Sequence, residues 1–213
     1  MTPAEAFLRD QIPLAQRAVI PTTLKTAYSA AARVIQAEPI LNVASAQDGR
    51  GRFVQWAVDL AFEKLVSSGQ WANGYEWRPF DKPTGRYLEI HFSHSRLTIS
   101  QVANPKQQPR NVGFRANLRI SNKMPSLFPE EPKPNAEGMP HILLMHGHQD
   151  LNFAHLAIPS ANNIFGFQHR STNLMNIAHL APQEEVPMEQ TDYDVVMELK
   201  EEIDKWRRDN NLG

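Results

Sequence analysis

Apolar residues recur at helical spacing through the first third of the chain. Thr2-Pro3-Ala4-Glu5 has the composition of a helix start, with a capping hydroxyl, a proline in the first turn and an acid at the capping-box position. Pro13 interrupts this helix, and a second helix is predicted from Pro21 to the residues before Pro39. The segment RFVQWAVDLAFEKLV predicts a third helix that is apolar over most of its circumference and therefore central to the core. Its main stripe is Phe53, Trp56, Ala57, Leu60, Ala61 and Leu65, broadened by Val54, Val58 and Phe62.

After Gly69 the apolar period changes to two, which is typical of strands. RYLEIHF and RLTISQV predict two strands joined by a short connection at 93–95. GFRANLRIS predicts a third strand, in which Phe114, Ala116, Leu118 and Ile120 face one way and Arg115, Asn117, Arg119 and Ser121 face the other. HILLMHG and LNFAHLAIP predict two more strands, after a proline-rich connection at 125–140.

The carboxy-terminal region predicts one further helix. Thr191 can cap it, acids lie in its first turn and bases in its last, and Val195, Val196, Leu199, Ile203 and Trp206 form an apolar stripe. We therefore expect an α+β fold in which amino-terminal helices pack on an antiparallel sheet of about five strands, closed by this amphipathic helix. The expected organisation is a single domain over 1–180, with a helical arm at 1–70 and a sheet region at 75–160. An acidic linker at 181–190 and the helix at 191–210 follow.

The amino-acid composition excludes several classes of site. The 213 residues include no cysteine, which excludes disulfides, thiolate catalysis and cysteine-ligated metal centres within this chain. No apolar run approaches the ~20 residues that cross a bilayer, and the amino terminus lacks the features of a signal peptide. These features predict a cytoplasmic protein without a membrane partner.

Charge is divided along the chain although the net charge is only −1. Residues 71–123 contain nine basic and three acidic groups, whereas residues 181–213 contain four basic and ten acidic groups. Such a division is typical of a polyanion-binding face, or of an acidic tail that neutralises a basic face. A solvated surface with clustered charges is the simpler alternative.

The basic segment supplies the main candidate binding residues. Arg115 and Arg119 share the polar face of the predicted strand with Asn117. Same-face neighbours in a strand are ~7 Å apart, a spacing that a phosphate backbone could follow. Few aromatic residues accompany them, which favours duplex or general polyanion contact over single-strand stacking. The candidate residues of this face are Lys106, Arg110, Arg115, Asn117, Arg119 and Lys123.

A second candidate anion site lies in ASAQDGRGRFVQW. Gly49 and Gly51 precede the third predicted helix, and Arg50 and Arg52 stand at its start. Cations are unfavourable at a helix amino terminus, so a bound anion would resolve the conflict. The segment lacks the remaining residues of a P-loop or dinucleotide fingerprint, and ion pairing of both arginines to acids within the chain is the alternative.

The candidate metal ligands lie in LLMHGHQDLNFAHLAIP. His146, His148 and Asp150 have side chains that can bind zinc, manganese or iron. The pattern resembles the HxHxD of metallo-β-lactamase-type hydrolases over five residues, but Leu151 stands where that family has its next histidine.

The geometry of strand pairing favours a hairpin without a metal in this segment. If 147–150 is the loop, His146 lies opposite Leu151 and His155 lies opposite Ile142, roughly 13 Å away along the strand. A third ligand would then come from another segment, and His91, His94, His169 and His179 are the candidates. Glycine and aspartate are common in hairpin turns without a metal, so no cofactor is predicted. A bound divalent transition metal is the alternative.

Three functional hypotheses follow. The leading one is a nucleic-acid- or polyanion-binding module that uses the basic segment together with Arg50 and Arg52. The first alternative is a metal-dependent hydrolase centred on the HxHxD loop. The second is an interaction or regulatory module that binds a protein partner, or a second copy of the chain, through 191–210. Motifs for nucleophilic catalysis are absent, so enzymatic activity is left open.

Overall fold

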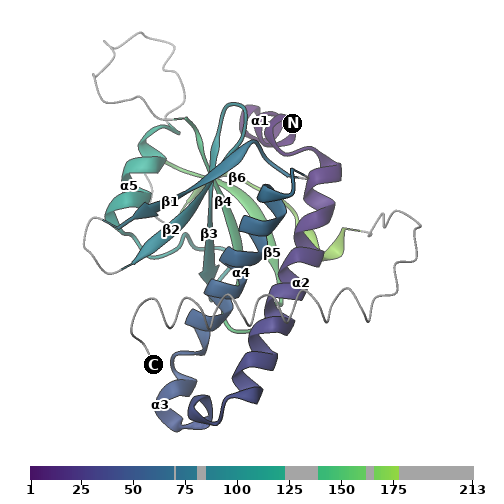
Figure 1. The fold of residues 1–213 in the computed structure, drawn as a ribbon. Helices are drawn as coiled ribbons and strands as arrows, with labels where there is room; N and C mark the ends of the chain where they lie inside the picture. The colour runs from purple at the N-terminus through teal and green to yellow at the C-terminus, as the bar shows by residue number, and fades with distance from the viewer. Residues whose placement is uncertain (70, 81–84, 123–138, 162–165, 178–213) are drawn as a thin grey trace, which may run out of the picture.

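The computed structural model is an α+β fold with helices on both faces of a six-stranded mixed sheet (Figure 1). It describes residues 1–69, 71–80, 85–122, 139–161 and 166–177. The acidic linker and the carboxy-terminal helix predicted at 191–210 lie outside these ranges, as does Lys123.

The helices of the amino-terminal arm are α1 (Pro3–Gln11), α2 (Leu14–Ala37), the short η1 (Pro39–Asn42) and α3 (Ala44–Gln47), and α4 (Arg50–Ser67). The Thr2 hydroxyl caps α1 by accepting a hydrogen bond from the Glu5 amide at 3.2 Å, as predicted. The prediction that the second helix starts at Pro21 is wrong. Pro21 lies buried inside α2, where packing of Ile20 and Leu24 on the core offsets the hydrogen bond that a proline cannot make.

The predicted apolar stripe of α4 is also displaced. The residues it buries are Val54, Ala57, Val58, Phe62 and Val66, whereas Phe53, Trp56 and Leu60 are only half-buried. Because this helix is apolar over most of its circumference, its sequence does not determine which side is buried. Packing against α2 and the sheet determines it.

The sheet runs in chain order β1-β2-β3-β4-β5-β6. The strands are β1 (Gly74–Pro79), β2 (Arg86–His91), β3 (Arg96–Val102), β4 (His141–Gly147), β5 (Ala154–Pro159) and β6 (Phe167–Arg170). Neighbouring strands are antiparallel except β3 and β4, which are parallel. The expectation of about five antiparallel strands is therefore corrected to six strands in a mixed sheet.

The third predicted strand is a helix, α5 (Gly113–Ile120). Alternation of apolar residues over eight positions also places Phe114 and Leu118 one helical turn apart, and Ala, Asn, Leu and Arg lack the β-branched side chains that favour strands. Parallel strands require a crossover of a dozen or more residues, and α5 belongs to the connection from β3 to β4. A short 3-10 helix, η2 (Leu174–Asn176), follows β6.

The main core lies between the sheet and the amino-terminal helices. Ile90, Leu97, Ile99 and Leu144 of the sheet meet buried residues of α2 and α4, which cross the sheet side by side in Figure 1. The opposite face has a smaller apolar cluster of Val102, Leu143, Met145, Phe153 and Ala157, and it carries α5. Among the described residues, no helix is long and apolar enough to cross a membrane.

One buried acid beside the main core makes the stability of the fold depend on pH. Asp59 of α4 is buried, and this burial raises the pKa of its carboxyl to about 7, although Gln55 donates a hydrogen bond to Oδ1 at 2.8 Å. The folded-state pKa exceeds the unfolded value, so the folded chain holds a proton that the unfolded chain has released. The stability that this proton contributes is present below about pH 4 and is lost as pH rises towards 7.

We predict that Asp59→Asn removes this pH dependence. The variant should match the wild type near pH 4 and exceed its free energy of unfolding at pH 8 by on the order of 3 kcal/mol. Urea denaturation across this pH range measures the difference. Asp48→Asn, at an exposed position, is the matched control and should change neither value; parallel pH profiles for Asp59→Asn and the wild type would contradict the prediction.

Candidate functional site

The arginines predicted to lie along a strand lie on α5 instead. Arg115 and Arg119 are one helical turn apart and still share a face, whereas the exposed Asn117 is rotated away from them. Lys106 and Arg110 are exposed in the connection that precedes α5. The predicted row of same-face side chains is thus replaced by a pair on a helix and two residues before it.

Arg115 is the most constrained of these cations. Its Nη2 donates to the Ser100 hydroxyl on β3 at 2.9 Å, and its Nη1 donates to the Arg110 carbonyl at 3.1 Å. Its Nε is buried and has no hydrogen-bond partner in the described part of the chain. Burial lowers the pKa of the guanidinium to about 10, because loss of solvation disfavours the charged form.

Aromatic rings hold α5 against the sheet. Phe114 stacks on Tyr87 of β2 with ring centroids 4.0 Å apart, and Phe80 packs against both rings. The Arg115 guanidinium lies 4.8 Å from the Phe114 centroid, within the range of a cation–π contact. These rings contact one another, which leaves fewer ring faces for stacking on nucleic-acid bases.

Arg50 and Arg52 begin α4, as predicted. The helix has neither a side-chain cap at Gly49 nor an acid in its first turn, so two cations stand at its positive end. Arg52 is exposed, while Arg50 is half-buried with its Nε unpaired within the described ranges. Because α4 and α5 lie on opposite faces of the sheet, these arginines belong to a different surface from Arg115 and Arg119.

The HxHxD segment ends β4 and enters a hairpin, which confirms the predicted turn. The predicted register is wrong, because the connection is longer than four residues: His146 pairs with Ala154, and His155 pairs with Met145. His155 is therefore separated from His146 by the sheet itself, since adjacent positions face opposite sides.

The three candidate ligands of this segment differ in environment. His146 is fully buried, whereas His148 and Asp150 are exposed. Burial first, and the nearby His148 to a smaller degree, lower the pKa of His146 to about 4, so its imidazole is neutral at pH 7. Burial and then the charge of Asp150 raise the pKa of the Tyr28 hydroxyl, which contacts His146 Nδ1 at 2.7 Å.

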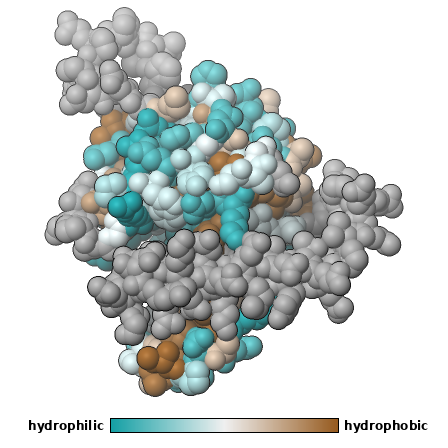
Figure 2. Space-filling model, in the orientation of Figure 1, coloured by the Kyte–Doolittle hydropathy of each residue, from teal (hydrophilic) through white to brown (hydrophobic). Residues whose placement is uncertain are grey.

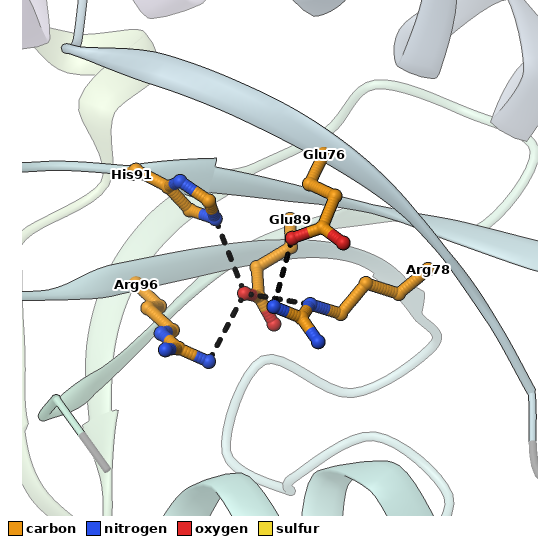
Figure 3. A network of polar contacts seen from close by, with 5 residues as sticks. All are labelled: Glu76, Arg78, Glu89, His91 and Arg96. Atoms are coloured by element: carbon orange, nitrogen blue, oxygen red, sulfur yellow. Dashed lines mark hydrogen bonds and ion pairs between the residues drawn. The ribbon is translucent and has the colours of Figure 1, made fainter.

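Sequence patterns did not reveal a charge network on β1–β3 (Figure 3). Glu89 of β2 has a fully buried side chain whose Oε1 lies 3.1 Å from Arg78 Nε, 3.2 Å from His91 Nε2 and 3.3 Å from Arg96 Nη1. Arg78 also pairs with the half-exposed Glu76 at 2.8 Å. One indication of this network was present in the sequence, the position of Glu89 on the polar face of the alternating segment RYLEIHF. An acid at such a position is normally expected to be exposed to solvent.

Glu76, Glu89 and His91 are also the group of acidic and histidine side chains, among the described residues, whose ligand atoms lie within 4.8 Å of one another. The two guanidiniums that already contact Glu89 oppose a further cation at this point. We therefore interpret the network as ion pairing that neutralises a buried carboxylate.

Comparison with known proteins identifies no relative: no family model, curated protein or solved structure matches the chain.

We predict that Glu89→Gln is strongly destabilising, because it removes the charge that three basic groups share. Breaking a fully buried ion pair costs about 3–5 kcal/mol, and we expect roughly 2–4 kcal/mol here, since Arg78 and Arg96 keep partial solvent access. The free energy of unfolding in urea measures the loss. Glu76→Gln changes an exposed acid of the same network and should cost under about 1 kcal/mol; equal losses in both variants would show that Glu89 is not central to it.

Proposed function

We propose that the chain binds nucleic acid through the phosphate backbone, using the cations on and before α5. The observation that carries the proposal is the guanidinium of Arg115, which is largely withdrawn from water and has no acidic partner among the described residues. A desolvated cation without an opposite charge is costly. A phosphate oxygen beside the half-buried guanidinium would supply that charge.

The surroundings of Arg115 support a polyanion rather than a single small anion. Arg119, Arg110 and Lys106 add three cations, and no acidic residue occurs between Glu89 and Glu130 in the sequence. The upper part of the molecule is mainly hydrophilic in the view of Figure 2, with small apolar patches along its left edge. Clustered cations without interspersed acids give the positive potential that attracts a phosphate backbone.

The aromatic residues indicate which form of nucleic acid is favoured. Phe114, Tyr87 and Phe80 stack on one another at the base of α5. Single-strand binding proteins use exposed rings as platforms for bases. Arginines presented on a helix over a closed ring cluster favour contact with the backbone of a duplex. Arg50 and Arg52, on the other face, form a separate anion contact in this proposal.

We predict that the full chain binds duplex DNA or RNA with an affinity that falls steeply with salt, and that Arg119→Ala weakens it. Removing one phosphate contact should lower the slope of log affinity against log salt by about 1 unit. Fluorescence anisotropy with a labelled duplex between 50 and 200 mM salt measures both quantities. Arg115→Ala should have at least the same effect, because Arg115 makes the proposed central contact.

The matched control is Arg33→Ala, which removes an exposed cation from α2 on the other side of the sheet. It should leave affinity and slope unchanged. Heparin as competitor tests for general polyanion binding. Binding that is absent at low salt, or that responds equally to Arg33→Ala and Arg119→Ala, would refute the proposed surface.

A further inference from the structure

Polar side chains converge where the two parallel strands end. β3 and β4 run in the same direction, so their carboxyl ends meet at one edge of the sheet. Gln101 and His146 are paired positions at this edge, and both side chains lie on the face covered by α2 and α4. The carboxyl ends of parallel strands are a common location for ligand sites in α/β sheets.

The hydrogen bonds of Tyr28 determine the tautomer of His146. Its hydroxyl oxygen contacts both the Gly147 carbonyl oxygen and His146 Nδ1. A carbonyl oxygen can only accept a hydrogen bond, so the Tyr28 hydroxyl donates its proton to Gly147. His146 Nδ1 must then carry a hydrogen and donate it to the hydroxyl. With the proton on Nδ1, Nε2 is the acceptor nitrogen of this tautomer.

This free nitrogen lies in a buried position. His146 Nε2 has no hydrogen-bond partner among the residues that the structure describes, and the side chain is fully buried. The two ring nitrogens point in diverging directions, so Nε2 points away from Tyr28 on α2. A buried acceptor without a donor is costly, so this nitrogen is available to bind a ligand.

Gln101, the strand partner of His146, presents a second unpaired acceptor among the described residues. Its Nε2 donates to the Gly51 carbonyl at 2.7 Å, and this bond assigns the amide orientation, since the reverse would place two oxygens in contact. Its Oε1 is buried and unpaired within the described ranges. Gln101 therefore offers an oxygen next to the strand position of His146.

His148 brings a second imidazole to the same place. A Cβ added to Gly51 would lie 3.1 Å from His148 Cε1, 3.7 Å from His148 Nδ1 and 3.5 Å from Gln101 Oε1. Both side chains therefore border the space that glycine leaves at the start of α4. His148 is exposed, so its ring reaches solvent and provides the entry side of the site.

We propose that His146 Nε2, Gln101 Oε1 and His148 form a binding site for a divalent transition metal ion such as Zn²⁺. Two imidazole nitrogens and an oxygen are a ligand set suited to zinc, and three protein ligands leave a fourth position for water or an anion. The bond from Nδ1–H to Tyr28 is the outer hydrogen bond that orients metal-binding histidines.

This ligand set differs from the HxHxD reading of the sequence. Gln101 of β3 joins the two histidines, and Asp150 is not among the ligands. The neutral acceptors are also better placed than Glu76, Glu89 and His91, whose carboxylate is already bound by Arg78 and Arg96. The arginines that begin α4 make an anion, such as hydroxide or phosphate, the expected fourth ligand.

The test is a titration of the untagged full chain with Zn²⁺ by calorimetry, and with Co²⁺ as a spectroscopic probe of imidazole coordination. One ion per chain is expected. His148→Ala, at an exposed position, should weaken binding at least 10-fold, and Tyr28→Phe should weaken it about 10-fold by removing the orienting hydroxyl. Circular dichroism verifies that each variant is folded.

Two matched controls separate this site from others. His94→Ala, an exposed histidine between β2 and β3, should leave the affinity unchanged. His91→Ala tests the acidic group on β1 and β2, and loss of binding in this variant would overturn the proposal. Failure to bind Zn²⁺, or equal affinity of His148→Ala and the wild type, would also overturn it.

The metal site and the arginines of α5 lie on opposite faces of the sheet. Arg119→Ala should retain Zn²⁺ affinity, and His148→Ala should retain the salt-dependent duplex affinity. The two proposals can therefore fail separately.

Discussion

The parallel pairing of β3 and β4 is the constraint on which the rest of the structure depends. Parallel neighbours cannot be joined by a tight turn, so the chain must leave the sheet at Val102 and return at His141. This excursion contains α5, which places its arginines on the face opposite α2 and α4. The same pairing brings the ends of both strands to one edge, where Gln101 and His146 become neighbours.

The two faces of the sheet bury different kinds of side chain. Beneath α2 and α4 the strands contribute mainly apolar side chains, and the main core forms there. The face that carries α5 buries Glu89, Thr98, Ser100 and His141, and Ser100 accepts a hydrogen bond from Arg115. Thr98 and His141 form a hydrogen bond of 2.9 Å with each other, whereas Glu89 contacts two guanidiniums and an imidazole. Polar groups in such a layer are costly unless they are paired, which makes the remaining unpaired atoms informative.

The pattern of apolar residues predicted most elements but not their arrangement. Helix α1 and strands β2–β5 follow from periodicity, although β4 and β5 pair in a different register. The error at Gly113–Ile120 arose because eight residues fit both periods, and the choice depended on the parallel pairing, a contact between distant segments. The error at Pro21 has a similar origin, since burial against the core outweighed a local preference.

For the candidate sites, too, the sequence predicted the residue types but not their arrangement. Their residue types were evident from the sequence: cations before and within 113–120, arginines at the start of α4, and histidines at the end of a buried strand. The partners came only from the fold, because Gln101, Gly51 and Tyr28 are distant from His146 in the chain and carry no local signal. The sequence by itself determined the mixed α+β composition, the hairpin and the inventory of charged groups. The tertiary structure alone decided strand direction, the separation of the two arginine groups and which polar atoms are left unpaired, because each depends on contacts between segments that periodicity cannot relate.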